Sequence, residues 1–270
     1  SLIIPTYAQM KDPALIPAAV NTALSEIGLW DIAPRNLFRI SWHNQPQASG
    51  GGFGDVNYME LPSSLTGVDA RVIALVGKWF PTGAHKVGAA FSCLVPRLVT
   101  GQFDPTTQKA VWPSTGNYCR GGAYDSALLA TESIAILPEG MSQERFDWLA
   151  EIAGEVIKTP GSESNVKEIF DKCWELRESG QDLMIFNQFD ELGNYLWHYA
   201  ITGAAMEAVL QAELGTGRYA GVTLTTGSAG TIDCGDYLKQ LFPSSKIVAS
   251  EALQCPTLLE NGYGAHRIEG

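Results

Sequence analysis

The stretch "GVTLTTGSAGTIDCGDYLKQLF", residues 221–242, has the pattern of a strand, a tight loop and a helix. Its first part is short and β-branched, the loop from Gly227 to Thr231 consists of small residues, and a helical pattern follows. Backbone N–H groups can converge in such a loop, and the start of a helix adds partial positive charge. The stretch is therefore a candidate phosphate cradle, with an ordinary strand-to-helix turn as the alternative interpretation.

The same alternation of strands and helices runs through most of the chain. Short apolar segments bounded by turn residues are predicted as strands at residues 70–77, 109–114, 132–138, 154–160, 182–189, 221–227 and 246–252. Their continuous apolar runs favour strands that are buried on both faces of a parallel sheet. Helices are expected between them, one capped by Ser142 and another capped by Ser164 and ended by Gly180. This order predicts an α/β architecture.

The amino-terminal part of the chain is less regular. Within it, "NQPQASGGGFGD" at residues 44–55 combines glycine with short polar side chains. Such a composition is typical of loops, so we expect a flexible loop or lid at this position.

The composition is that of a globular protein, with 270 residues of which 45% are hydrophobic and 17% are charged. A formal net charge of −11 disfavours binding to nucleic acids and anionic membranes, because its field repels both. No apolar run reaches the roughly 20 residues that cross a bilayer, and "SLIIPTYAQMKDP" lacks the pattern of a secretory signal. These observations predict a cytoplasmic protein that binds neither nucleic acid nor membrane.

The cysteines and histidines are spaced too irregularly for a disulfide framework or a metal site. The five cysteines form no CxxC pair, and the four histidines form neither HExxH nor HxH. We therefore expect reduced thiols and no metal.

Two further segments have residues suited to a ligand. In "WPSTGNYCRGGAY", residues 112–124, a predicted strand ends in hydroxyl and amide side chains, and a helix is expected from about Gly121 and Gly122 onward. Such groups suit a carboxylate or a ring oxygen, although Ser and Asn also serve simply as caps and turns. In "FPTGAHKVGAAF", residues 80–91, Lys86 lies among small residues after an apolar run. Tight apolar packing can make a lysine amine reactive, whereas an exposed loop lysine is the commoner case.

Several motifs, in order from about Asn57 to the end, resemble those of the β-family (fold type II) of pyridoxal-phosphate enzymes, in particular its cysteine synthase and cystathionine β-synthase branch. "GAHK" resembles the Schiff-base lysine segment, with a His-Lys pair that is also typical of tryptophan synthase β subunits. "STGN" resembles the substrate loop "TSGN", and "GSAGT" resembles the phosphate loop "GTGGT". "LPEGMSQER", "NQFDELGNYLWHYAITGAAM" and "GAHRIEG" resemble "PExMSxER", "QQFxNPxNxxxHxxTTGPE" and "HKIQG".

The resemblance implies roles for individual residues. Pyridoxal 5′-phosphate is the implied cofactor, and Lys86 is the lysine that bonds to it and then moves the substrate Cα proton. Asn117 is expected to contact the 3′ oxygen of the cofactor. The phosphate is expected in the loop of Gly227, Ser228, Ala229, Gly230 and Thr231. The substrate carboxylate is expected at Ser114, Thr115, Asn117 and Gln188, with Tyr118 beside it.

The sequence also departs from the family pattern. Tyr118 stands where cysteine synthases usually have a small Thr, which predicts a narrower or more aromatic pocket unless the ring packs outward. Arg120 is unusual at its position and could pair with a second anionic group of the substrate, a surface arginine being the alternative. Ala229 replaces a glycine, which requires a negative φ there.

The resemblance further implies two α/β subdomains with the cofactor in the cleft between them. Residues 1–83 and 191–270 form the larger cofactor domain, and residues 84–190 form the smaller, mobile substrate domain. The family's partner for the pyridine nitrogen lies downstream of the "HKIQG" match, whereas this sequence stops at Gly270. We therefore expect the larger domain to be incomplete at its C-terminal end because the sequence is a fragment or a nicked chain. A second polypeptide that completes the site and a shortened fold are the alternatives.

The reaction implied by the resemblance is β-elimination followed by β-replacement on an L-amino acid, as when a cysteine synthase combines O-acetylserine with sulfide or a thiol. Elimination alone is one alternative, as in an amino acid dehydratase, ammonia-lyase or desulfhydrase. A catalytically idle subunit of a complex is another. A homodimer is the assembly that the resemblance implies.

Overall fold

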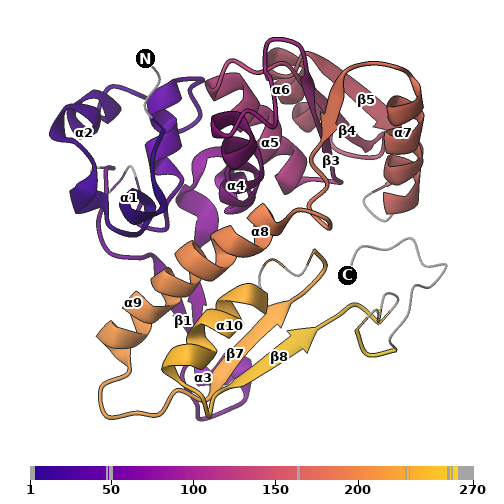
Figure 1. Cartoon of the computed structure of the whole chain (residues 1–270). Coiled ribbons are helices and arrows are strands. Elements are labelled where there is room, and N and C mark those ends of the chain that lie inside the picture. Colours follow the sequence, from indigo (N-terminus) through magenta and orange to yellow (C-terminus); the bar gives the residue numbers. More distant parts are fainter. Residues whose placement is uncertain are drawn as a thin grey trace.

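The main sheet of the computed structural model has four parallel strands in the order β5-β4-β3-β6 (Figure 1). The structure describes residues 4–46, 48, 51–162, 165–228, 230, 232–253, 256 and 258–260. The strands are β3 (Lys109–Pro113), β4 (Ser133–Pro138), β5 (Glu155–Thr159) and β6 (Leu183–Ile185). The predicted parallel α/β arrangement is confirmed here, although β6 is shorter than the segment 182–189.

Helices cover both faces of this sheet, as alternating side chains of β3 show. Trp112 lies in a core shared with the helices α4 and α5, whereas Val111 packs with Ile169 and Cys173 of α7 on the other face. The helices are α4 (Lys86–Val99), α5 (Asn117–Leu128), α6 (Gln143–Ile152) and α7 (Val166–Glu178). The central strands β3 and β4 are thus buried on both faces, as their apolar runs predict.

The ends of α6 and α7 follow the sequence only in part. Ser142 occupies the N-cap of α6 as predicted, but its side chain makes no capping hydrogen bond. The N-cap of α7 is Asn165, and Ser164, predicted for this role, lies outside the described residues. Gly180 follows the end of α7 with φ of 74°, a conformation that favours glycine and ends the helix as expected.

A second, smaller sheet carries the stretch that begins at residue 221. Its two parallel strands are β7 (Gly221–Thr225) and β8 (Lys246–Ser250), and α10 (Ile232–Leu241) connects them. In Figure 1 this helix lies across the strands, beside the long run of α8 (Leu192–Trp197), a π-helical turn (His198–Thr202) and α9 (Gly203–Glu213).

Burial on both faces, which the sequence predicts for β7 and β8, is wrong. Ile247 faces Gly235 of α10, but the side chain of Val248 on the same strand is 50% exposed. The reason is that, among the described residues, helix α10 covers one face of this sheet and no second layer covers the other.

A third small sheet corrects the prediction for residues 70–77. Strand β2 (Val72–Leu75) is antiparallel to β1 (Tyr58–Leu61), a strand that was not predicted from the sequence. The connection contains only the short helix α3 (Ser63–Thr66) and a turn at Gly67 with φ of 70°. Parallel strands need a longer crossover, so a connection of this length imposes antiparallel pairing.

The amino-terminal segment consists of short helices that join the main core. They are α1 (Tyr7–Lys11), η1 (Pro13–Leu15), α2 (Ala18–Leu24) and η2 (Pro34–Arg39), and η4 (Gly77–Trp79) and η5 (Pro81–Gly83) precede α4. Met10, Leu37 and Trp42 lie in the same buried cluster as α4. The described part of the 44–55 segment is tied together by a bridge between Asn44 and Phe53. Within the described residues, no helix is long and apolar enough to cross a membrane.

Candidate functional site

Lys86 is the first residue of α4 and reaches toward the loop that follows β7. Its Nζ atom lies 2.9 Å from Ser228 Oγ and 3.3 Å from Asn194 Oδ1. The chain enters the helix through Thr82 and Gly83, with φ of 65° and 72°, so a tight turn aims the lysine. The predicted Schiff-base lysine and the predicted phosphate loop are thus brought together across 142 positions of sequence.

Asn194, on α8, connects these two groups to a third. Its side-chain amide donates to the carbonyl oxygen of Ser228 at 3.2 Å and to that of Gln188 at 3.3 Å. The side chain is buried. No role was predicted for this asparagine, although it lies within "NQFDELGNYLWHYAITGAAM" and matches an asparagine of the family motif, which was the available signal.

The loop after β7 lies tightly against α8 and the π-helical turn. A Cβ atom at Gly230 would lie 2.6 Å from Asn194 Oδ1 and 2.7 Å from His198 Cδ2, so no larger residue fits without a shift. Gly227 and Ser228 are described together with Gly230, whereas Ala229 and Thr231 lie outside the described residues. A loop of small residues followed at once by α10 is suited to an anionic group, because the backbone N–H groups at a helix start favour one.

The second predicted loop ends β3 and begins α5. Ser114 Oγ accepts a hydrogen bond from the backbone N–H of Gly116 at 3.3 Å and from Gln188 Nε2 at 3.5 Å. Asn117 is exposed, and α5 begins at this residue rather than after Gly122. The early start places Thr115 and Asn117 at the N-terminal end of a helix, where a carboxylate is favoured. Gln188 thus links this loop to Asn194, because its side chain contacts Ser114 and its backbone carbonyl oxygen accepts from Asn194. Asn194 in turn contacts Lys86.

Two residues of this segment pack against aromatic side chains. Tyr118 is buried with its ring 5.5 Å from that of Trp112, and burial beside the Cys93 thiol raises the pKa of its phenol well above the usual value. The guanidinium of Arg120 lies between the rings of Trp30 and Trp148, at 5.2 Å from each. The outward packing considered for Tyr118 is therefore wrong, whereas the ion pair with substrate considered for Arg120 stays a prediction.

His85, the residue before Lys86, packs among other aromatic rings. His85 stacks between Trp42 at 5.8 Å and Trp197 at 6.5 Å, and its ring meets that of His198 at 5.1 Å. Burial and the neighbouring Lys86 lower the pKa of His85 to about 4 and that of His198 well below its usual value. Both imidazoles are therefore neutral at physiological pH.

His198 has one ring nitrogen with a partner and one without. The hydroxyl of Thr202 accepts from Trp42 Nε1 at 3.2 Å and lies 3.1 Å from His198 Nδ1. If Thr202 donates to Nδ1, the ring proton resides on Nε2, which is buried and has no partner among the described residues. This atom adjoins the ring carbon that faces Gly230.

A carboxyl group also borders the loop. Asp233 lies in the first turn of α10, is 3% exposed, and its Oδ2 atom has no hydrogen-bond partner in the described part of the chain. Desolvation and Asp236 raise the pKa of Asp233, which Lys86 lowers in part, to about 7. No role was predicted for Asp233, because a single acidic residue at a helix start gives no sign in the sequence that it is buried.

These residues fit the cofactor that the family resemblance implies. An amine, a hydroxyl and a loop in which a Cβ atom does not fit converge at the start of a helix, and a buried imidazole nitrogen without a partner adjoins the loop. Such donors suit a phosphate, and Lys86 suits the aldehyde. Among the described residues, the carboxyl of Asp233 disfavours an anion at this loop when it is ionised.

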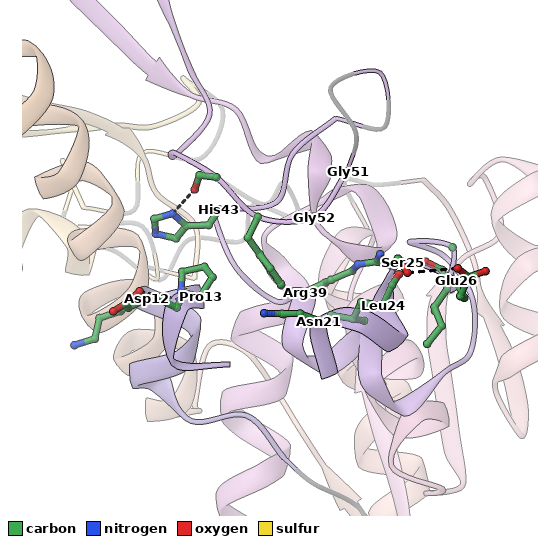
Figure 2. Close-up of a pocket in the computed structure, with 16 residues that line it drawn as sticks. Asp12, Pro13, Asn21, Leu24, Ser25, Glu26, Arg39, His43, Gly51 and Gly52 are labelled. Carbon is green, nitrogen blue, oxygen red and sulfur yellow. Dashed lines mark hydrogen bonds between the residues drawn. The ribbon is translucent and has the colours of Figure 1, made fainter. Parts of the chain in front are cut away.

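A separate hollow of about 920 Å³ lies between the amino-terminal helices and the glycine-rich segment (Figure 2). It is lined by residues such as Asp12, Glu26, Arg39 and His43, and by none of the predicted site residues. The guanidinium of Arg39 already donates to backbone carbonyl oxygens of the α2 region. Within the described ranges, no group of three or more His, Cys, Asp or Glu side chains could hold a metal ion.

Comparisons with known proteins agree with this geometry. A probable cysteine synthase of Bacillus subtilis is 30% identical over 191 residues, which cover 70% of this chain and 60% of that protein. A cysteine synthase of Staphylococcus aureus is 32% identical over 191 residues, covering 70% of this chain and 59% of that protein. The chain therefore spans about 60% of the length of these curated relatives.

The fold is that of the fold type II pyridoxal-phosphate enzymes. The solved structure of an O-acetylserine dependent cystathionine β-synthase from Helicobacter pylori superposes with a TM-score of 0.65 at 23% sequence identity, covering 80% of this chain and 69% of that chain. Residues 75–268, more than half of the chain, match the family described as pyridoxal-phosphate dependent enzyme. The chain thus belongs to the family of pyridoxal-phosphate dependent enzymes, whose cofactor is pyridoxal 5′-phosphate.

Proposed function

We propose that the protein catalyses β-replacement on an L-amino acid, as a cysteine synthase does with O-acetyl-L-serine and sulfide or a thiol. The contact of Lys86 Nζ with Ser228 Oγ at 2.9 Å carries this proposal, because it joins the lysine to the loop after β7. The similarity to cysteine synthases of two bacteria supports the choice of reaction within the family.

Lys86 is proposed as the residue that binds the cofactor covalently and later moves the Cα proton of the substrate. When bound, pyridoxal phosphate withdraws electrons from the Cα atom of an attached amino acid and so makes this proton acidic. The amine lies at the start of α4. Ser228 and Asn194 lie within hydrogen-bond distance of the amine and are proposed to orient it.

The substrate carboxylate is proposed to bind at the end of β3. Ser114, Thr115 and Asn117 offer hydroxyl, amide and backbone N–H groups at the N-terminal end of α5, and Gln188 holds Ser114 from the side. A carboxylate held here is oriented before reaction, which lowers the entropic part of the barrier. The buried ring of Tyr118 supports a role in shaping the wall beneath this loop rather than in contacting substrate. The loop of Gly227, Ser228, Ala229, Gly230 and Thr231 is proposed to hold the cofactor phosphate.

We also propose that residues 84–190 form a mobile substrate domain that closes on the rest of the chain. The four-stranded sheet lies within these residues, whereas β7 and β8 lie outside them. Closure would exclude water from the reacting groups.

Product analysis tests the proposed reaction. Purified protein with pyridoxal phosphate is incubated with O-acetyl-L-serine and sulfide, and both cysteine and keto acid are quantified. Cysteine formation supports β-replacement. Pyruvate and ammonia in place of cysteine would show elimination alone. If neither cysteine nor keto acid formed from any β-substituted amino acid tested, a catalytically idle subunit would be favoured.

Two lysine variants complete this experiment. Lys86→Ala is expected to lose product formation, whereas Lys78→Ala is expected to retain it, because Lys78 is exposed and its amine lies over the ring of Trp79. Turnover by Lys86→Ala at the parent rate would contradict the role proposed for this lysine.

A further inference from the structure

Asp233 is a buried carboxyl group next to the loop that is proposed to hold the cofactor phosphate. It belongs to the first turn of α10, directly after the loop of residues 227–231, and its side chain is 97% shielded, with an exposed fraction of 3%. Its Oδ2 atom is buried without a hydrogen-bond partner among the described residues. A buried polar atom without a partner is costly, so its retention at this loop points to a ligand.

The charged and titratable groups around Asp233 are few. Lys86 of α4 attracts the carboxylate and Asp236 of α10 repels it, while Tyr195 of α8 lies near both carboxyls. Cys234 is the next residue of α10, and its thiol pKa is raised to about 12. The elements packed against α10 add three further groups: neutral His198 of the π-helical turn, Glu207 of α9, which accepts from Tyr237, and exposed Lys246 of β8.

Burial raises the pKa of Asp233 by more than Lys86 lowers it, so the pKa of this carboxyl is about 7. A phosphate monoester carries close to two negative charges in the same pH range and can only accept hydrogen bonds. An ionised Asp233 would repel it across a poorly solvated gap, whereas a protonated carboxyl would donate a short, charge-assisted hydrogen bond to it.

We propose that Asp233 is a positioning residue of the phosphate loop that binds the cofactor phosphate in its protonated form, so that the affinity for pyridoxal phosphate falls as this carboxyl ionises. The inference rests on the proposed function, because it requires the phosphate to lie in the loop after β7. It adds a pH dependence of cofactor binding that a loop of backbone N–H groups and hydroxyls alone would not produce.

The test measures the dissociation constant of pyridoxal phosphate across pH 6 to 8 for the parent protein and for Asp233→Asn, by quenching of tryptophan fluorescence. The phosphate and aldehyde groups of pyridoxal phosphate titrate in the same way in both experiments. The ratio of the dissociation constant of the parent protein to that of the variant therefore reports the ionisation of Asp233. Because the pKa of Asp233 in the free protein is about 7, the ratio of the parent dissociation constant to the variant dissociation constant is expected to rise about tenfold from pH 6 to pH 8.

Two controls separate this role from a general charge effect. Asp236→Asn removes a negative charge from the same helix but leaves the Asp233 carboxyl in place, so this variant is expected to keep a pH dependence whose midpoint lies at lower pH, because Asp236 raises the pKa of Asp233. Pyridoxal, which lacks the phosphate, is expected to show a ratio that does not change with pH. Asp233→Ser, whose hydroxyl donates at every pH, is the second variant if Asp233→Asn unfolds, and the parent-to-variant ratio is expected to rise in the same way.

Each outcome bears on the proposal. A ratio that stays constant from pH 6 to pH 8, or one that rises equally with pyridoxal, overturns the role of Asp233 while leaving the proposed function intact. No binding of pyridoxal phosphate to any of the proteins at pH 6 overturns the proposed function, and the inference fails with it.

Discussion

Asp125, on α5, is a carboxyl group that is buried without a hydrogen-bond partner among the described residues. Its side chain is fully buried, and neither carboxylate oxygen has a hydrogen-bond partner in the described part of the chain. Desolvation raises its pKa well above the usual value. The group is therefore protonated in the folded protein at pH values where the unfolded chain has already ionised it.

This difference predicts how Asp125→Asn changes stability with pH. Because the folded state binds more protons than the unfolded state above about pH 4, the parent protein loses stability as pH rises, by up to about 1.4 kcal/mol per pH unit. The loss continues until the raised pKa of the folded state is reached. Asn does not titrate, so the free energy of unfolding of the variant relative to the parent is expected to increase from pH 4 to pH 7.

Urea unfolding at several pH values measures this difference. Asp69→Asn is the matched control, because Asp69 is exposed, and its stability relative to the parent is expected to change little with pH. If the Asp125→Asn difference were constant across this range, the carboxyl would not be buried as described.

At this scale the sequence predicted the residues whose chemistry is carried by a motif. Lys86, Ser114, Ser228 and Gln188 were all singled out, and the structure brings them into one hydrogen-bonded group. Asp233 could not be predicted, because its importance comes from its burial and from its proximity to Lys86, which only the fold determines.

Among the helices, the close contact of α4 with α5 positions the lysine. A Cβ atom at Gly121 of α5 would lie 2.7 Å from the Val87 Cα atom and 3.1 Å from the carbonyl oxygen of Lys86. The neighbours are backbone atoms, which cannot rotate away, so a side chain here would displace the start of α4.

Gly121→Ala is therefore expected to destabilise the protein. Alanine favours a helix over glycine by about 1 kcal/mol, whereas overpacking of a close contact costs about 1–3 kcal/mol, so the contact prevails. The melting temperature should fall, and the affinity for pyridoxal phosphate should weaken because Lys86 moves. Gly77→Ala is the control, since its Cβ atom would lie 3.5 Å from the ring of Trp42, an ordinary contact. A melting temperature at or above that of the parent protein would contradict the close approach of the two helices.

The presence of the helices and strands was easier to predict than where each one ends and whether both faces of a sheet are covered. The apolar runs of β3 and β4 indicated burial on both faces correctly, since α5 and α7 flank them. The similar runs of β7 and β8 did not, because periodicity does not report whether a second layer covers a sheet. The start of α5 at Asn117 was also missed, since glycines at 121 and 122 argue locally against a helix that tight packing nevertheless favours.

Across the whole molecule, the amino-terminal segment is part of the main core. Trp42 packs on Phe80 at 5.0 Å, stacks on His85 at 5.8 Å, and donates from Nε1 to Thr202, 160 positions later in the chain. The sequence described this region only as irregular, because such contacts join segments that are far apart and have no local pattern.

Trp42→Ala is accordingly expected to reduce the free energy of unfolding by about 3–5 kcal/mol, the usual cost of removing a large buried aromatic side chain. Trp174→Ala removes an equal side chain that is 60% exposed and should change the stability by no more than about 0.5 kcal/mol. Chemical denaturation of both variants measures the contrast. Equal losses would mean that the amino-terminal segment does not join the core.

Borohydride reduction of the protein with bound pyridoxal phosphate, followed by mass spectrometry of its peptides, locates the lysine that holds the cofactor. The position of Lys86 Nζ beside Ser228 and Asn194 predicts a pyridoxyl group on the peptide that carries Lys86, and its loss in Lys86→Ala but not in Lys78→Ala. A pyridoxyl group on another lysine, or equal labelling of Lys86→Ala, would contradict the assignment of this site.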